Sequence, residues 1–305
     1  MWQVHRFRGV VVTNDNQQKK YKLEFLIVMC SFGILGPIVK AIGFPSPVIA
    51  FFRASIAGIS LAIYYFARNK RVDKATRKRC FIPLIICGIC LAGDWITLFT
   101  AYNYTTVATA TICYYIEPIL VLIGSGIFLK EKIRTKHLIC IIVAFIGVAF
   151  VSGIVENGLP SLAELKGVLI AALGAAFYAV IVILNKKLMT DVDPVFKTMF
   201  QLLVAAVITM PYVLATEDLS ALVFTPKKIA LLLFLGIVMT AFTYIFYFSN
   251  VVRIPTKTAA IFSYGDPVVA VIVSVLFLHE PISIYGIIGA VLVIGSAVFS
   301  ELELV

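Results

Sequence analysis

The stretch that decides the fold is 106–148, which reads YIEP at 115–118 and FLKE at 128–131, with an apolar run after each. A second stretch, 255–297, reads YGDP and FLHE at the same relative positions, again with apolar runs. A shift of 149 positions superposes the Tyr, the acid–Pro pair, the Phe-Leu pair and the final Glu of the two stretches. Such a repeat at one fixed offset predicts a chain built from two copies of a half-length unit.

Composition places the chain in a membrane. The 305 residues are 61% hydrophobic and 14% charged, whereas a soluble domain is about half apolar and about a quarter charged. The apolar residues come in blocks of about twenty, the length at which a helix crosses a bilayer. The sequence therefore predicts an all-α membrane protein of ten helices, at roughly 23–41, 47–67, 81–101, 107–129, 136–153, 166–186, 195–215, 228–249, 257–278 and 282–300.

The predicted spans divide into a first five-helix repeat, 23–153, and a second, 166–300, after a polar arm at 1–22. Most of the 26 Lys and Arg residues lie in the arm and in the even-numbered gaps between spans. By the positive-inside rule both termini then lie in the cytoplasm, and the chain is a multi-pass protein of the cell inner membrane. Because each repeat has an odd number of spans, the two repeats are inverted, which is a design typical of alternating-access transporters.

The formal net charge of +10 raises nucleic acid as a partner. No basic stripe is interleaved with exposed aromatic residues, as single-strand binders require, so this class is excluded. Cys87 and Cys90 form a C-x-x-C inside a predicted span, which favours apolar packing over redox or metal chemistry. The sequence contains neither a phosphate-binding loop nor a metalloprotease or nucleophile-elbow motif, so we expect neither an enzyme nor a cofactor.

Ionisable side chains inside spans are costly and default to functional roles. Arg53 lies in the second span, where it either pairs with Asp94 structurally or binds a substrate carboxylate or phosphate. Asp94 is the strongest candidate for proton coupling, and its rival interpretation is a buried acid that stays neutral. Trp95, Tyr115 and Tyr264 are the aromatic candidates for lining a cavity around these groups.

The repeated acids, Glu117 and Asp266, each stand directly before a proline. Pro118 and Pro267 free the carbonyl one turn earlier and predict structural kinks at the centre of the membrane. The acids then either cap backbone amides at the kink or take part in gating and proton transfer. Glu131 and its counterpart Glu280 end their spans and favour a helix-terminal or gating contact.

The acid–Pro pair in each fourth span, followed by Phe-Leu-x-Glu before each fifth, resembles the drug/metabolite transporter superfamily, specifically the EamA-like transporters. The resemblance covers about 23–299, and Arg53 resembles an arginine often found early in the second span of such proteins. His279 and Pro281 depart from the commoner polar residues. The resemblance implies ten helices in two inverted repeats and the movement of small organic solutes, with substrates that differ widely across the family.

These observations predict a secondary-active transporter of a small organic metabolite (an amino acid, a nucleobase or a drug-like molecule), an exporter that works by alternating access with protons as candidate coupling ions. Its other expected partner is the lipid bilayer, and it acts as a monomer or weak homodimer. The alternative is an uncoupled facilitator or exchanger of an organic anion such as a sugar phosphate or nucleotide sugar. A membrane enzyme or sensor is a third class. The predicted substrate-binding residues are Arg53, Asp94, Trp95, Tyr115 and Tyr264, and the proton-coupling or gating residues are Asp94, Glu117 and Asp266.

Overall fold

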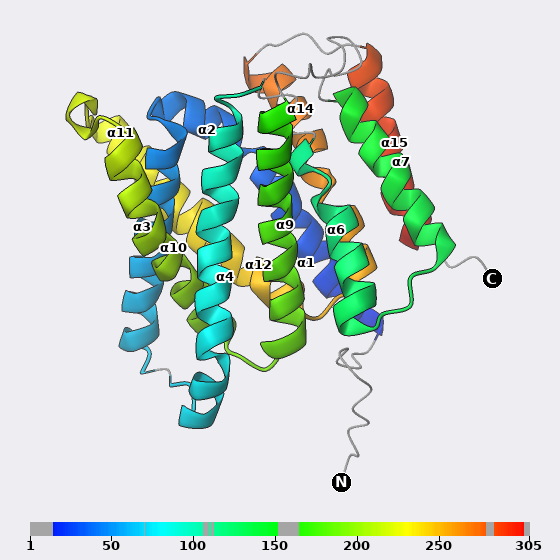
Figure 1. The fold of residues 1–305 in the computed structure, drawn as a ribbon, viewed down its shortest axis with the longest axis horizontal. Coiled ribbons are helices and arrows are strands. Elements are labelled where there is room, and N and C mark those ends of the chain that lie inside the picture. Colours follow the sequence, from blue (N-terminus) through cyan, green and yellow to red (C-terminus); the bar gives the residue numbers. More distant parts are fainter. Residues whose placement is uncertain are drawn as a thin grey trace.

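The computed structural model describes residues 15–69, 71–105, 110, 113–151, 165–278 and 284–301. Most of the predicted N-terminal arm, His279, Glu280 and Pro281 lie outside these residues. Within the described ranges every regular element is a helix, which confirms the predicted class (Figure 1). In chain order the elements are α1 (Asp15–Gly33), α2 (Leu35–Ile42), α3 (Ser46–Ala67), α4 (Lys74–Ala101), α6 (Glu117–Gly124), η1 (Ser125–Leu129), α7 (Thr135–Val151), α9 (Leu165–Leu188), α10 (Pro194–Thr216), η3 (Leu219–Ala221), α11 (Pro226–Gly236), η4 (Ile237–Phe242), α12 (Thr243–Asn250), α13 (Thr256–Phe262), α14 (Gly265–Leu278) and α15 (Ile284–Glu301).

Six helical segments of the described chain are long and apolar enough to cross a bilayer: Asn16–Ile42, Ser46–Ala67, Lys74–Ala101, Leu165–Leu188, Pro194–Thr216 and Pro226–Asn250. Shorter apolar helices cover Glu117–Leu129, Thr135–Phe150 and Ile284–Ser296. The predicted span at 257–278 corresponds to two consecutive helices, α13 and α14. The membrane class is thus clear, and the count of ten spans stays a prediction.

Side-chain caps fix where two of the long helices begin. The Asp73 carboxylate accepts the backbone N–H of Thr76 at 2.9 Å ahead of α4. Asp193 does the same for the first turn of α10, at 2.9 Å from Val195 N and 3.0 Å from Phe196 N. Such caps satisfy backbone donors that have no partner inside the helix. Both helices therefore start at a sequence-encoded point, at the edge of the bundle.

Both acid–Pro pairs stand at the start of a helix. α6 begins at Glu117 after a turn at 115–116, and α14 begins at Gly265 after a turn at 263–264. Proline suits this place because it lacks the N–H that a helix interior needs, while the first turn does not need it. Pro118 and Pro267 therefore lie directly behind a break in the helix rather than in the middle of one.

Helices of one predicted repeat pack mainly on helices of the other. The most extensive contacts join α7 to α15, α4 to α9 and α3 to α10, followed by α4 with α10 and α1 with α14. Figure 1 shows α7 and α15 side by side at one end of the bundle, away from α3 and α11. The interior between these pairs is where the buried side chains of the two repeats meet.

Glycine permits the closest of these approaches. A Cβ on Gly88 in α4 would lie 2.5 Å from Val204 Cβ and 2.9 Å from the Gln201 carbonyl oxygen of α10. A Cβ on Gly147 in α7 would lie 2.8 Å from the Gly289 carbonyl oxygen of α15. Small residues at membrane helix contacts let the backbones approach closely, which gains dispersion energy.

Gly88→Ala should lower the stability of the protein by about 1–3 kcal/mol, the usual cost of overpacking a tight contact. The added methyl group meets a backbone oxygen of α10 that cannot rotate away. Thermal unfolding of the purified variant in detergent measures the loss. Gly295→Ala is the matched control, because a Cβ there meets nothing within 4 Å. A Gly88→Ala protein as stable as Gly295→Ala would contradict the tight α4–α10 contact.

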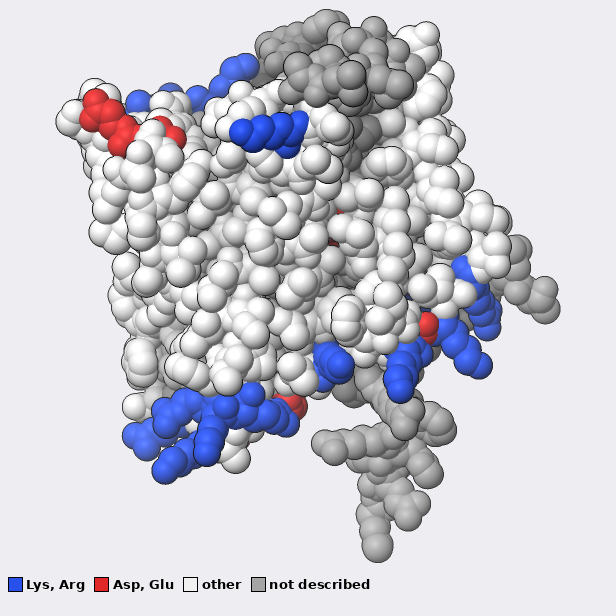
Figure 2. Space-filling model, viewed as in Figure 1, with Lys and Arg blue, Asp and Glu red and all other residues white. Residues whose placement is uncertain are grey.

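Basic side chains gather along one edge of the molecule. Figure 2 shows Lys and Arg concentrated at the edge that carries the start of α4 and the start of α7, and few on the opposite edge. Comparison with Figure 1 shows that the start of α1 and the end of α15 lie at this same edge. We call it the basic edge. It is the structural counterpart of the charge asymmetry in the sequence.

Candidate functional site

Ionisable and aromatic side chains from both predicted repeats meet inside the bundle. They are held by α3, α4, the turn before α6, α6, α9, α12 and α14. Many of them are almost fully buried. We call this set the central cluster: Arg53, Asp94, Trp95, Tyr114, Tyr115, Glu117, Tyr178, Tyr244, Tyr247 and Asp266.

Arg53 is oriented by an aromatic face and a hydroxyl group. Its guanidinium carbon lies 5.4 Å from the ring centroid of Trp95, a cation–π contact. Its Nε donates to the Thr240 hydroxyl at 3.1 Å. No carboxylate among the described residues forms an ion pair with Arg53, so the structural pair with Asp94 that the sequence left open is not present. The two Nη groups make no hydrogen bond to the described chain and can meet a ligand.

Thr240 takes its position from a π-helical segment. It lies in η4, between α11 and α12, and its hydroxyl donates to the carbonyl of Leu235, five residues earlier, at 2.7 Å. Thr243 repeats this five-residue contact with Val238 at 3.1 Å. One-turn π segments inside α-helices recur at functional sites. The widened turn here brings a hydroxyl to Arg53.

Asp94 is a buried acid with an uncommitted oxygen. Its side chain is 3% exposed, and its Oδ1 has no hydrogen-bond partner among the described residues. The Tyr114 hydroxyl lies beside the carboxyl group. A buried polar atom without a partner costs free energy, so its retention calls for an explanation such as a ligand or a transferred proton.

Tyr115 connects the two acid–Pro segments. Its hydroxyl donates to Asp266 Oδ2 at 3.1 Å, across the boundary between the predicted repeats. Its own carbonyl accepts the hydroxyl of Tyr264 at 3.2 Å. Ile119 N donates to the carbonyl of Ile116 at 3.0 Å, and not to Tyr115. The Tyr264 hydroxyl therefore satisfies a carbonyl that the helix break leaves without a helical donor.

Glu117 brings the acids together. Its side chain is 4% exposed, and its charged neighbours are the carboxyl groups of Asp94 and Asp266. The three carboxyl groups thus lie close together, and the nearest link to the Arg53 guanidinium is Tyr244, which neighbours Arg53, Asp94 and Asp266. Like charges repel strongly in a low-dielectric interior. The cluster therefore attracts protons or a positively charged ligand group.

Three further tyrosines belong to the central cluster. The hydroxyls of Tyr178 in α9 and Tyr247 in α12 are hydrogen-bonded to each other. Tyr244 is an electrostatic neighbour of Arg53 and Asp94, and its hydroxyl contacts Trp95. Aromatic faces of this kind hold flat or cationic organic groups.

Two side-chain hydrogen bonds also join the predicted repeats. Glu131 Oε1 accepts the Thr256 hydroxyl at 2.7 Å. Asn250 Nδ2 donates to Glu24 at 3.0 Å. Within the second predicted repeat, Lys186 Nζ donates to the carbonyl of Ile254 at 2.5 Å.

The described part of the chain contains no cluster of side chains that could bind a metal ion. No group of three or more His, Cys, Asp and Glu side chains there is arranged to hold an ion. Cys87 and Cys90 are buried free thiols, as their apolar surroundings predict.

Tyr264→Phe should destabilise the protein by about 0.5–1.5 kcal/mol, the net worth of one hydrogen bond, with little direct effect on ligand binding. The ring is 0% exposed and its hydroxyl contacts only the chain. Tyr115→Phe is the matched variant and should instead change ligand binding, because it frees Asp266. Thermal unfolding and ligand affinity, measured on both variants, separate the two roles. The same binding defect in both would contradict this division.

The apolar spans packed around buried charged groups define a multi-pass membrane protein, and its relatives are transporters. The chain is 28% identical over 284 residues to the uncharacterized transporter YxxF of Bacillus subtilis (strain 168), covering 92% of this chain and 89% of that protein. It is 27% identical over 258 residues to an uncharacterized transporter of Archaeoglobus fulgidus, covering 84% of this chain and 89% of the relative.

The chain belongs to the EamA-like transporter family, whose family model matches residues 21–153 and 165–301. This confirms the resemblance that the repeated motifs indicated. A crystal structure of a protein superposes with a TM-score of 0.82 at 17% identity, covering 93% of this chain and 97% of the other. At that identity the likeness concerns the fold alone. The protein is a membrane transporter.

Proposed function

We propose that this transporter is secondary-active, carries a small organic metabolite, and works by alternating access around the central cluster. The observation that carries the proposal is the clustering of Asp94, Glu117 and Asp266 inside the bundle, with Arg53 linked to this group through Tyr244. Charged groups at this depth are retained where they bind a substrate or move protons. The cluster takes one acid from each acid–Pro motif, so both repeats contribute to it.

The helix contacts support a pair of inverted five-helix repeats, 23–153 and 166–300. By their order in the chain, α3 of the first repeat corresponds to α10 of the second, and α7 corresponds to α15. Each of these two contacting pairs therefore joins equivalent helices, as a twofold axis between the repeats requires. In the same way α1 corresponds to α9, and α6 corresponds to α14. The contact between α1 and α14 has its equivalent in the contact between α9 and α6. A pseudo-twofold arrangement gives two equivalent states, open to opposite sides of the membrane. Pro118 and Pro267, directly behind the helix breaks, then act as the paired pivots.

The charges favour a substrate that carries an amine, such as an amino acid, over an organic anion. Asp94 would meet the ammonium group or a proton, and Arg53 would hold a carboxylate with its free Nη groups. Trp95 and Tyr115 would form the aromatic walls. Tyr264 lies beside the site, and its hydroxyl donates to the backbone carbonyl of Tyr115. Glu117 and Asp266 would gate the site and pass protons.

In the proposed orientation the basic edge and both termini face the cytoplasm, and the membrane is the cell inner membrane. Family likeness favours export, with protons moving inward as substrate moves out. Asp94 then binds the proton and the substrate amine in turn, since one carboxylate cannot be fully paired with both.

The test is uptake into proteoliposomes of a panel of radiolabelled amino acids, nucleobases and sugar phosphates, with and without a pH gradient. We expect saturable uptake of an amine-bearing compound that the gradient accelerates. Saturable uptake of sugar phosphates alone would contradict the proposed substrate class. Movement of none of the panel, with a lipid or other compound chemically converted instead, would contradict transport of a small metabolite.

The second candidate is an uncoupled facilitator or exchanger of an organic anion. It is favoured by one observation, the uncommitted Nη groups of Arg53 beside Trp95. This function predicts exchange that is indifferent to the pH gradient and is lost when Arg53 is neutralised. The same panel therefore separates it from proton-coupled export.

A further inference from the structure

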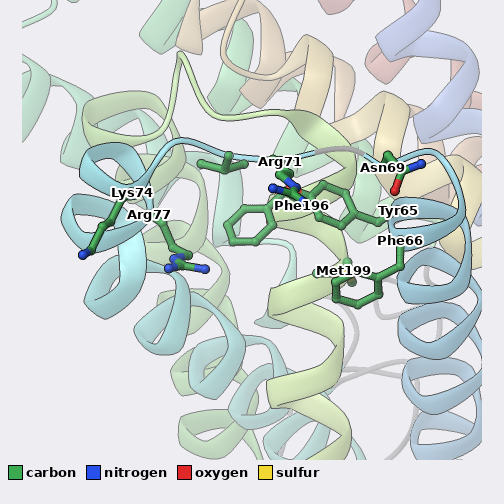
Figure 3. Close-up of a pocket in the computed structure, with 9 residues that line it drawn as sticks. Tyr65, Phe66, Asn69, Arg71, Lys74, Arg77, Phe196 and Met199 are labelled. Carbon is green, nitrogen blue, oxygen red and sulfur yellow. The ribbon is translucent and has the colours of Figure 1, made fainter.

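A pocket of about 560 Å³ lies at the basic edge, away from the central cluster. It opens between the end of α3, the start of α4 and α10, as Figure 3 shows. We call it the α3–α4 pocket. Its principal lining residues are Tyr65, Phe66, Arg71, Lys74, Arg77 and Phe196.

One part of the pocket is cationic. Arg71, Lys74 and Arg77 line it, and no described acidic residue does. The nearby Asp73 carboxylate is engaged as the cap of α4, where it accepts Thr76 N at 2.9 Å. The next arginine, Arg79, is held by both carboxylate oxygens of Asp191, at 2.7 and 2.6 Å. The pocket therefore presents basic charge that the described acids around it do not neutralise.

The other part is aromatic and continues onto the apolar outer surface. Tyr65 is buried, and its ring lies 5.6 Å from that of Phe196, centroid to centroid. Phe66 lines the pocket and is 69% exposed, and one turn away on the same helix Ile63 is 66% exposed. An exposed apolar surface on a spanning helix faces the acyl chains of the bilayer. The pocket thus has a cationic part, and beside it an aromatic part that continues onto the lipid-facing surface.

We propose that the α3–α4 pocket binds an anionic phospholipid from the leaflet at the basic edge. Arg71, Lys74 and Arg77 would hold the phosphate headgroup, and an acyl chain would lie along Phe66. Arginine and lysine clusters at the membrane surface attract anionic headgroups, and the guanidinium fork matches phosphate oxygens. A soluble phosphate would use the cationic part alone and would leave the aromatic wall without a role.

Native mass spectrometry of the full chain in detergent, with phosphatidylglycerol or phosphatidylcholine added, tests the proposal. The wild type should retain phosphatidylglycerol in clear preference. The triple variant Arg71→Gln, Lys74→Gln, Arg77→Gln should lose at least about tenfold of that preference, since each basic residue near the surface contributes about fivefold. The matched control, Lys130→Gln, Lys132→Gln, Arg134→Gln, removes three charges from the same edge outside the pocket and should keep it.

Two results would overturn the proposal. One is an equal loss in the control variant, which would mean that binding follows the overall charge of the edge. The other is displacement of phosphatidylglycerol by glycerol 3-phosphate at equal concentration, which would identify a site for soluble phosphates. If the triple variant does not fold, two other measurements still test the proposal: competition between phosphatidylglycerol and glycerol 3-phosphate on the wild type, and lipid retention by the single variant Phe66→Ala. Phe66→Ala should weaken retention of the lipid and leave any binding of glycerol 3-phosphate unchanged.

Discussion

An Asp94→Asn variant should lose all accumulation driven by a pH gradient while it still carries substrate down a concentration gradient. With one proton exchanged per substrate, a gradient of one pH unit sustains about tenfold accumulation, because 1.4 kcal/mol corresponds to a factor of ten. The variant should equilibrate at equal concentrations inside and outside. Asparagine keeps the shape of the side chain and cannot take up or release a proton. Tracer uptake at steady state measures the ratio directly.

Each of the two aspartates of the cluster receives a tyrosine hydroxyl, Asp94 from Tyr114 and Asp266 from Tyr115. Of the three acids, Asp94 alone has a carboxylate oxygen, Oδ1, that is shielded from solvent and has no hydrogen-bond partner in the described chain. Asp191→Asn is the matched control, because that carboxylate is exposed at the basic edge and bound by Arg79. It should accumulate substrate like the wild type. Gradient-driven accumulation that survives in Asp94→Asn would contradict coupling through this residue.

Arg53→Gln should raise the half-saturation constant for a carboxylate-bearing substrate by about 10–100-fold. A hydrogen bond to a charged group contributes about 1.5–3 kcal/mol, and the Nη groups of Arg53 make no hydrogen bond to the residues that the structure describes. Arg53→Lys should give a smaller defect, because lysine keeps the charge and loses the planar fork. Initial uptake rates over a range of substrate concentrations measure the change.

Arg68→Gln is the control for Arg53. Arg68 also lies over an aromatic ring, 5.8 Å from the centroid of Tyr64, yet it stands at the exposed end of α3. Its removal should leave the half-saturation constant unchanged. If Arg53→Gln also leaves it unchanged for substrates that carry a carboxylate, then Arg53 has a packing role beside Trp95 and does not bind the ligand.

The sequence predicts the membrane class and the interior position of the acids because both follow from simple physical rules. Apolar length identifies a bilayer helix, and an ionisable residue inside such a length must face the bundle interior. Asp94, Glu117 and Asp266 do lie close together in the structure. The acid–Pro pairs indicate an irregular helix, and the breaks lie directly in front of Glu117 and at Tyr264.

The contacts that orient the site do not follow from the sequence. Thr240 reaches Arg53 only because η4 widens the helix by one residue, and no periodicity in the sequence marks a π segment. Tyr264 resembles a cavity-lining aromatic by its position, yet its hydroxyl serves the carbonyl of Tyr115. Such pairings depend on how two distant segments pack. The offset of 149 residues aligns these two tyrosines without revealing that one donates to the other.

Two lysines show the same limit. Lys186 and Lys197 lie at the facing ends of the predicted spans 166–186 and 195–215, where the charge pattern leads one to expect exposed side chains, but they are 7% and 1% exposed. Their ammonium groups donate to the backbone carbonyls of Ile254 and Met189 near helix ends. Those carbonyls lack helical partners, so they accept a buried lysine. A pattern of charges along the chain cannot distinguish such a lysine from one in water.

The central claim is that the cluster opens alternately to the two sides of the membrane, and cysteine labelling tests it most directly. The six native cysteines are replaced, and Tyr244→Cys places one thiol beside Arg53 and Asp94. Val207→Cys, at a side chain 69% exposed on the apolar outer surface of α10, is the control. A membrane-impermeant maleimide applied to one side at a time should label position 244 from both sides and position 207 from neither. Labelling of position 244 from one side only, or from neither, would contradict alternating access at this site.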